Sequence, residues 1–183
     1  MSILTWLVIL EIILAIVMVG SFVFFFFAAC SIYTNLTTGI PWAKIRRENI
    51  DKIFKEIKLP KNSLLYDLGA GDGRVILAAE KLGLKARGFE LSLYPYLRAW
   101  FKIFIGQRRA QIKRQDFFKE NLDQADAVFM FLTGRALLKL SQKLKHELKP
   151  GAIIISHGFA LPGWQSDKTI LTKPSLTYVY KVN

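Results

Sequence analysis

The chain has 183 residues, 52% of them hydrophobic, and its 26 lysines and arginines against 14 acidic residues give a formal net charge of +12. This hydrophobic content excludes the disordered and fibrous classes, and the length allows one domain with an appendage. The single cysteine, Cys30, excludes an intrachain disulfide and a cysteine-based zinc site, and with only two histidines we expect no metal site.

The first 35 residues are predicted to form one transmembrane helix. Between Ile3 and Ala29 the only charged side chain is Glu11. A helix of about 27 residues is about 40 Å long, more than the roughly 30 Å hydrocarbon core of a bilayer. A cleaved signal peptide is the alternative, but it requires a basic start and a shorter apolar stretch. We therefore expect a single-pass membrane anchor, with the bilayer as a partner.

Positive charge follows this apolar segment and does not precede it. Lys44, Arg46 and Arg47 come shortly after it, and every lysine and arginine lies from Lys44 onward. Because cytoplasmic flanks are enriched in positive charge, the folded domain is predicted to face the cytoplasm or an equivalent compartment such as the mitochondrial matrix.

Residues 36–60 are predicted to form an amphipathic juxtamembrane helix. Apolar side chains recur there at helical spacing, at Ile45, Ile50, Ile53, Phe54 and Ile57. Two interpretations remain open. The helix could lie on anionic lipid, where each nearby lysine or arginine contributes about 1 kcal/mol, it could pack against the following domain, or both could hold.

Residues 61–183 alternate between predicted strands and helices. The expected strands are apolar runs at 63–68, 86–91, 110–115, 125–132 and 151–156, with helices between several of them. Repeated units of this kind predict an α/β fold with a parallel sheet covered by helices on both faces. The end of the chain differs, because 169–173 and 176–182 flank a Pro-Ser turn and predict an antiparallel hairpin.

The first predicted strand ends in a glycine-rich turn, DLGAGDGR, at residues 67–74. In open parallel sheets, ligands bind at the carboxyl ends of the strands. A dinucleotide fingerprint would need a glycine where Arg74 stands, and Asp72, which suits a helix N-cap, would repel a pyrophosphate there. Glu90, at the end of the second strand, is placed to accept hydrogen bonds from both hydroxyls of a ribose. We therefore expect a cofactor that contains adenosine, and not NAD.

The turn resembles the first motif of class I S-adenosylmethionine-dependent methyltransferases, E/DxGxGxG. The resemblance implies a Rossmann-like, mostly parallel sheet closed by an antiparallel C-terminal hairpin, with S-adenosylmethionine as the cofactor. The binding residues that it implies are Asp67, Gly69, Ala70, Gly71, Gly73, Glu90, Leu91, Asp116 and Phe117.

The same resemblance implies a role for each part of this set. Asp67 and the glycine turn would lie against the methionine part of the cofactor, and Glu90 would hold the ribose. Leu91 would pack on the adenine, while Asp116 and Phe117 would contact its edge and face. The catalytic residue stays unassigned: Asp126 is expected near the floor of the site, and His157 could accept a proton, although a structural role suits that histidine better.

A narrower resemblance extends over most of the chain. The leading apolar helix, the strings DLGAGDGR, GFELS and QDFF, and the string from Ile155 to Trp164 are similar to one family. It contains the mitochondrial lysine methyltransferases of the ATP synthase c-subunit and of the adenine nucleotide translocase, with microbial relatives. The chain departs from this family at Ser92, where asparagine is usual, and at Thr133-Gly134, where proline is frequent.

The end of the fourth predicted strand bears on the methyl acceptor. Enzymes that methylate planar amines often carry N/D-P-P-Y/F there, but this chain has Phe131-Leu132-Thr133-Gly134. An alkyl amine needs mainly positioning and desolvation. We therefore expect methylation of a lysine in a membrane protein.

Three alternatives remain open. The acceptor could be a lipid or another small hydrophobic molecule. The basic and aromatic residues between Arg98 and Arg114 could bind RNA, although such a helix is more often a solvated face, and we do not expect nucleic acid as a partner. The domain could also bind the cofactor without catalysis.

Overall fold

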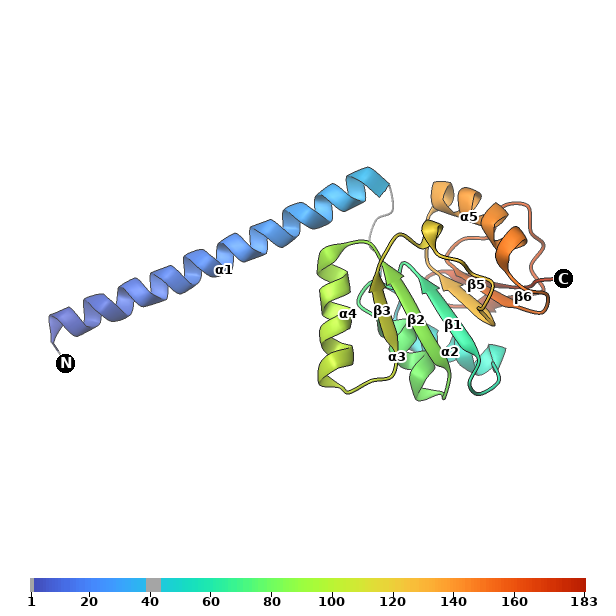
Figure 1. Cartoon of the computed structure of the whole chain (residues 1–183), viewed down its shortest axis with the longest axis horizontal. Helices are drawn as coiled ribbons and strands as arrows, with labels where there is room; N and C mark the ends of the chain where they lie inside the picture. Colours follow the sequence, from blue (N-terminus) through green and yellow to red (C-terminus); the bar gives the residue numbers. More distant parts are fainter. Residues whose placement is uncertain (1, 39–43) are drawn as a thin grey trace.

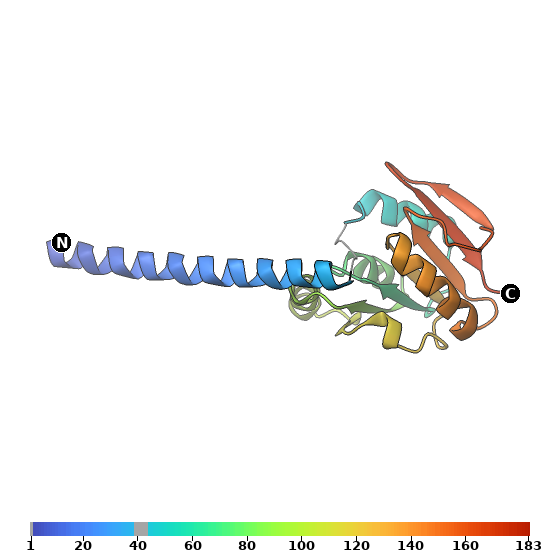
Figure 2. The ribbon, with the colours of Figure 1, turned by 90° about the horizontal axis from the view of Figure 1, so that it is seen from above.

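The computed structural model describes residues 2–38 and 44–183 (Figure 1). A long helix, α1 (Ile3–Thr38), extends away from an α/β domain that holds the other elements (Figures 1 and 2). Part of the predicted juxtamembrane segment, residues 39–43, lies outside the described residues.

The domain is built on one seven-stranded sheet with the order β3-β2-β1-β4-β5-β7-β6. The first five strands are parallel, and β7 pairs antiparallel with both β5 and β6. The strands are β1 (Leu64–Leu68), β2 (Lys85–Glu90), β3 (Gln111–Arg114), β4 (Ala127–Met130), β5 (Ile153–His157), β6 (Lys168–Leu171) and β7 (Leu176–Lys181). The predicted parallel sheet with an antiparallel C-terminal hairpin is therefore confirmed.

Alternation along the central strands divides the core into two layers. Leu65 of β1 and Phe129 of β4 belong to one buried cluster, whereas Tyr66 and Met130 belong to the other. Successive side chains of a strand point to opposite faces, so a sheet buried on both sides needs apolar residues at nearly every position. The continuous apolar runs in the sequence reflect this requirement.

Helices cover both faces of the sheet. On one face lie α2 (Arg47–Ile57) and α3 (Arg74–Lys81), and on the other lie α5 (Gly134–Glu147) and the short 3-10 turn η1 (Phe117–Lys119). The helix α4 (Leu93–Ile105) packs beside β2 and β3, at the margin of the domain nearest α1 (Figure 1).

The structure shows where the apolar face of the juxtamembrane segment lies. Its helix begins at Arg47, and Ile50, Ile53 and Phe54 on its apolar face are buried in one cluster with α3. That face is occupied by the domain and is not available to lipid. The apolar face of this helix therefore packs against the domain, and the helix is shorter than the predicted segment.

The helix α1 has 36 residues, which corresponds to a length of about 54 Å. The stretch Ile3–Cys30 is long and apolar enough to cross a membrane, and none of its most apolar window is buried in the protein. Near its C-terminal end, the ring of Phe27 lies 6.1 Å from that of Tyr94 in α4. The end of the apolar stretch is therefore next to the start of α4.

Candidate active site

The carboxyl ends of the parallel strands meet at one edge of the sheet, as the sequence predicts. A small cavity at this edge is lined by the glycine turn and by residues of β4 and of the segment before α2. Its lining comprises Lys44, Ile45, Asp67, Gly69, Ala70, Gly71, Asp72, Arg74, Val75, Phe129 and Phe131. Phe129, Phe131, Lys44 and Ile45 were not among the predicted site residues.

The backbone of the turn requires its glycines. Gly69, Gly71 and Gly73 have φ angles of 85°, 55° and 77°, in the left-handed region that side chains disfavour. A Cβ on Gly73 would also lie 2.9 Å from the Cβ of Ala99 in α4. The glycines therefore let the chain fold back closely at the point where a ligand would approach.

Glu90 holds this turn in place. Its Oε2 accepts a hydrogen bond from the backbone N–H of Gly71 at 2.8 Å, and its Oε1 accepts one from that of Ser92 at 2.7 Å. Burial raises the pKa of Glu90, and these backbone donors partly oppose that rise. Each carboxylate oxygen can accept a second hydrogen bond, so the anchored carboxylate can still receive two hydroxyl donors.

Asp67 has no comparable support. Its side chain is only 2% exposed, and among the described residues its Oδ2 has no hydrogen-bond partner. Burial raises the pKa of Asp67 well above its ordinary value, and the neighbouring charges of Glu90 and Asp72 add to this effect. A buried, unpaired acceptor at a cavity fits a cationic ligand group such as the ammonium of S-adenosylmethionine.

Asp72 is paired, and this corrects its expected role as a helix cap. The N-cap of α3 is Gly73, and both carboxylate oxygens of Asp72 accept hydrogen bonds from the guanidinium of Arg74 at 2.8 Å. The ammonium of Lys102 in α4 donates to Asp72 at 3.0 Å. Burial raises the pKa of Asp72, but these two cations outweigh burial and hold it well below its usual range.

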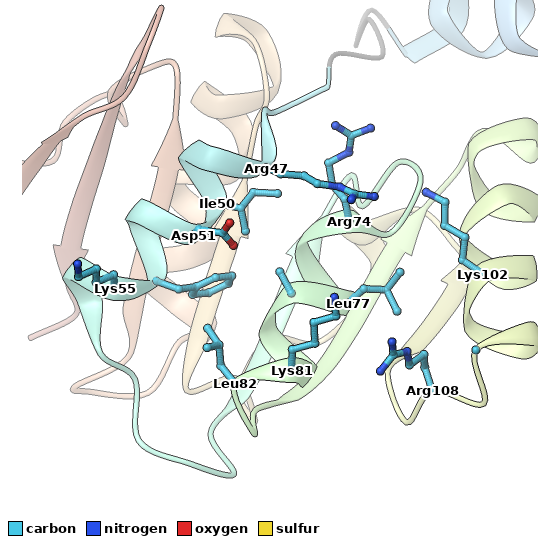
Figure 3. Close-up of a pocket in the computed structure, with 13 residues that line it drawn as sticks. Arg47, Ile50, Asp51, Lys55, Arg74, Leu77, Lys81, Leu82, Lys102 and Arg108 are labelled. Atoms are coloured by element: carbon cyan, nitrogen blue, oxygen red, sulfur yellow. The ribbon is translucent and has the colours of Figure 1, made fainter.

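This pairing also connects the turn to its surroundings. The Arg74 guanidinium donates to the backbone carbonyl of Ile45 at 2.7 Å, and Lys102 donates to the carbonyl of Asp72. Arg74, Lys102 and α2 border a larger cleft on the face of the sheet that α2 and α3 cover (Figure 3). The turn is therefore fixed from three directions: by Glu90, by α4 and by the segment before α2.

The residues predicted to contact adenine lie in different environments. Leu91 is 39% exposed directly after Glu90, and the backbone N–H of Gln115 donates to the Glu90 carbonyl, which brings the following Asp116 to the same edge. The Asp116 carboxylate accepts from the N–H of Phe118 and caps η1. Phe117 is buried in the core, with its ring 4.5 Å from that of Phe118.

Asp126 is not near this site, and its expected position at the floor is wrong. It precedes β4, and its Oδ2 accepts from the N–H of Leu64 at the start of β1 at 2.6 Å. Its Oδ1 forms an ion pair with Lys149 at 2.6 Å. Parallel strands begin at the edge opposite the one where they end, so a residue before β4 cannot face the cavity.

His157 is at the correct edge of the sheet, in a structural setting. Its Nδ1 lies 2.8 Å from the hydroxyl of Thr177, and its ring packs edge-on against Phe131, 4.7 Å away. Burial lowers the pKa of His157 to about 4. Phe131, which also lines the cavity, is the side chain between this histidine and the glycine turn.

The late string from Ser156 to Trp164 is held by its own hydrogen bonds. The Ser156 hydroxyl donates to the carbonyl of Phe159, and the indole of Trp164 donates to the hydroxyl of Ser141 in α5. The Tyr180 hydroxyl accepts from the N–H of Leu161. These contacts connect the string, which follows β5, to α5 and to β7.

Comparison with known proteins places this geometry in a family. A family model described as the ANTKMT methyltransferase domain matches residues 67–168. A protein-lysine N-methyltransferase of Saccharolobus islandicus (strain REY15A) is 32% identical over 135 residues, which cover 72% of this chain and 84% of the relative. The ATP synthase c-subunit lysine N-methyltransferase of Homo sapiens is 32% identical over 132 residues. This match covers 70% of the chain but 55% of the human protein, so the chain spans about half the length of that relative.

Solved structures agree on the fold. An RNA methyltransferase from Salinibacter ruber, crystallised with S-adenosyl-L-homocysteine, superposes with a TM-score of 0.72 at 24% identity. The superposition covers 76% of this chain and 94% of that one, while a ribosomal protein L11 methylase from Lactobacillus delbrueckii subsp. bulgaricus gives a TM-score of 0.63. The predicted class I methyltransferase fold and its cofactor are thereby confirmed. The chain belongs to the family of the ANTKMT methyltransferase domain and is an S-adenosylmethionine-dependent methyltransferase.

Proposed function

We propose that this protein is a membrane-anchored enzyme that methylates the ε-amino group of a lysine in a membrane protein. The observation that carries the proposal is the position of the apolar helix relative to the cofactor edge. Phe27 in α1 contacts Tyr94, which lies only four residues after the ribose-binding candidate Glu90. An anchor that ends there holds the site close to the membrane surface.

The proposed class of substrate rests on the names of the relatives. The relatives from Saccharolobus islandicus and Homo sapiens are named lysine N-methyltransferases, and one relative of 28% identity is the adenine nucleotide translocase lysine N-methyltransferase of Mus musculus. These names support lysine as the acceptor. A c-subunit-like or carrier-like membrane protein is the best candidate substrate.

The cofactor supplies an electrophilic methyl group on a sulfonium sulfur. We propose that Asp67 accepts a hydrogen bond from the ammonium of its methionine part, because Asp67 Oδ2 is buried and no described residue hydrogen-bonds to it. Glu90 receives the two ribose hydroxyls, and Gly69, Ala70, Gly71 and Gly73 allow close backbone approach. Leu91, after β2, and Asp116, after β3, contact the adenine. Phe117 is buried next to Asp116 and supports this part of the site.

The acceptor amine must be neutral before it reacts. An unperturbed lysine has a pKa of about 10.4, and transfer into an apolar environment lowers this value because burial disfavours the charged form. Phe129 and Phe131 provide apolar walls at the cavity. In the reaction the amine nitrogen forms a bond to the methyl carbon, the sulfur–carbon bond breaks, and the nitrogen releases a proton to water.

No side chain needs to act as the base in this scheme. His157 remains neutral near pH 7, since burial lowers its pKa to about 4, but its Nδ1 is engaged with Thr177. We therefore assign His157 a structural role. Among the described residues no cluster of three or more histidine, cysteine or acidic side chains is arranged to hold a metal ion.

We further propose that α1 crosses the bilayer once and that the domain faces the cytoplasm or an equivalent compartment. The support is the charge asymmetry of the sequence, with Lys44, Arg46 and Arg47 after the apolar stretch and no lysine or arginine before it. In this orientation the basic domain lies on the cytoplasmic side of the membrane, where positively charged flanking segments are retained.

The acceptor is tested with purified full-length protein, radiolabelled S-adenosylmethionine and native membranes. We expect label in one or a few membrane proteins at lysine, and loss of that label when Gly71→Val blocks cofactor approach at a position with φ of 55°. Label in the chloroform-extractable lipid fraction would favour a lipid acceptor, and label in RNA would favour nucleic acid. Either result would contradict the lysine assignment while leaving the cofactor site intact.

A further inference from the structure

The outward face of α4 carries large apolar side chains that the domain does not cover. Trp100, Phe101, Phe104 and Ile105 are 45%, 58%, 66% and 64% exposed. The rings of Trp100 and Phe104 stack on each other at 5.2 Å. The surfaces of soluble proteins rarely carry several adjacent apolar side chains of this size, and a contiguous group of them marks an interaction site.

Basic residues border the same face. Arg98, Arg108 and Arg109 are exposed on α4 and the turn that follows it, and the Arg98 guanidinium lies over the ring of Tyr94 at 5.7 Å. Lys102 in α4 and Arg108 in the turn after it also line the basic cleft that Figure 3 shows. Aromatic rings flanked by arginine and lysine are typical of helices that lie in the interface of an anionic membrane.

The position of α1 supplies the second, independent observation. The apolar stretch of α1 ends at Cys30, and Phe27 within its last turn contacts Tyr94 in the first turn of α4. In both views α4 lies on the side of the domain from which α1 extends, and Figure 1 shows it running across the direction of α1. A bilayer that surrounds α1 up to this level would meet α4 lengthwise.

We propose that α4 is an interfacial membrane-docking helix whose face of Trp100, Phe101, Phe104 and Ile105 inserts among the headgroups of the leaflet that α1 leaves. The occupant is the lipid surface, because the face is continuous with the end of the membrane-spanning stretch. This inference rests on the proposed crossing of the bilayer by α1. With two contacts, the domain has a fixed orientation, and the edge with Glu90 is held beside the membrane.

The docking is tested with the full chain in nanodiscs of neutral and anionic phospholipid. The only cysteine is removed by Cys30→Ala, and one nitroxide is attached through Phe101→Cys. A matched control uses Leu171→Cys, which is 63% exposed on the edge strand β6, at the end of the sheet opposite to β3 and α4. A third label through Val17→Cys reports on α1 alone.

Collision of each nitroxide with oxygen and with a water-soluble nickel complex then gives its depth. We expect position 101 to show a several-fold higher ratio of oxygen to nickel accessibility than position 171, with a further increase in anionic lipid. An aqueous ratio at 101, with a lipid ratio at 17, would overturn the docking and leave the anchor in place. Spin–spin broadening at 101 would show a second copy on this face and would also overturn it.

An aqueous ratio at position 17 would contradict the span itself and, with it, the docking. The docking can therefore fail while the span holds, and the label at position 17 distinguishes the two outcomes.

Discussion

The glycine turn and the adjoining strand end carry three buried carboxylates, Asp67, Asp72 and Glu90. Each of them has a different electrostatic environment. Asp72 is neutralised by Arg74 and Lys102, and Glu90 is held by two backbone donors. Within residues 2–38 and 44–183, no cation or backbone donor hydrogen-bonds to Asp67 Oδ2. Their side chains should therefore respond differently to pH and to substitution.

Substitution of Asp67 by asparagine should stabilise the ligand-free protein near neutral pH. The pKa of Asp67 is raised in the folded state, so its contribution to stability falls as pH rises above the unfolded value of about 3.8. The difference in unfolding temperature between the variant and the parent should therefore be small at pH 4 and increase toward pH 8. A constant difference across this range would contradict the raised pKa of Asp67. The same variant should also bind S-adenosylmethionine more weakly.

Substitution of Asp72 by asparagine should have the opposite effect. The pKa of Asp72 is depressed in the folded state, so its contribution is present above about pH 3.8 and is lost as pH falls through the folded value. We expect the variant to be destabilised by roughly 1 to 3 kcal/mol at pH 7 through loss of charge-assisted hydrogen bonds, and by less at pH 3. Thermal unfolding at both pH values measures this, and equal losses at the two would count against the ion pairs.

Glu90 should be the most sensitive site for cofactor affinity. In Glu90→Gln the new amide must turn a donor toward the N–H of Gly71 or of Ser92, so the anchored geometry is lost. The variant should bind S-adenosylmethionine roughly 10- to 100-fold more weakly, as expected for charge-assisted contacts of about 1.5 to 3 kcal/mol. Calorimetry decides this, with Glu56→Gln as the control, since Glu56 in α2 pairs with Lys168 outside the cavity. Unchanged affinity in Glu90→Gln would exclude the ribose role.

At the level of elements, the close approach of β2 to the glycine turn depends on Gly88. A Cβ there would lie 2.6 Å from the Cβ of Ala70 and 2.9 Å from the side chain of Ile112. Gly88→Ala should therefore destabilise the protein by about 1 to 3 kcal/mol through overpacking and displace Ala70 from the cofactor edge. The matched control is Gly134→Ala at the start of α5, where a Cβ meets nothing within 4 Å. Equal unfolding temperatures for the two variants would argue against this packing.

Most elements of the domain could be predicted from sequence because their signals are local. The strand from Leu64 to Leu68, its turn and the motif with Glu90 follow from an apolar run, glycines and an acid at fixed spacing. Asp126 shows where local signals end: an acidic residue beside a strand can lie at either edge of the sheet, and this one precedes β4, at the edge where the parallel strands begin. The pairing of Asp72 with Lys102, 30 residues away, depends on how α4 packs, which no local pattern reports.

At the scale of the whole molecule, the relation of α1 to α4 was equally inaccessible to sequence analysis. The apolar length of α1 is evident in the sequence, but its contact through Phe27 with Tyr94 arises from tertiary packing. The same is true of Lys44 and Ile45, which line the cavity although they precede the glycine turn by more than 20 residues. These contacts bring α1, Lys44 with Ile45, and the edge of the sheet that carries the glycine turn together.

The proposed orientation gives a prediction at this scale. Neutral substitutions of Lys44, Arg46 and Arg47 should weaken the preference of the domain for the cytoplasmic side, because flanking positive charge sets the orientation. A C-terminal reporter that is active only in the cytoplasm should be fully active on the parent chain and partly lost on the variant. A reporter that is active only after export of the parent would contradict the proposed orientation.

Methylation of a membrane-protein lysine is tested most directly by mass spectrometry of membrane proteins from cells that carry the gene, lack it, or carry Glu90→Gln. We expect a lysine in a membrane protein whose mass increases by one to three methyl groups only in cells with the intact gene. If membrane-protein lysines are identical in all three strains, while the purified enzyme transfers methyl groups to lipid or RNA, the claim of membrane-protein lysine methylation is contradicted.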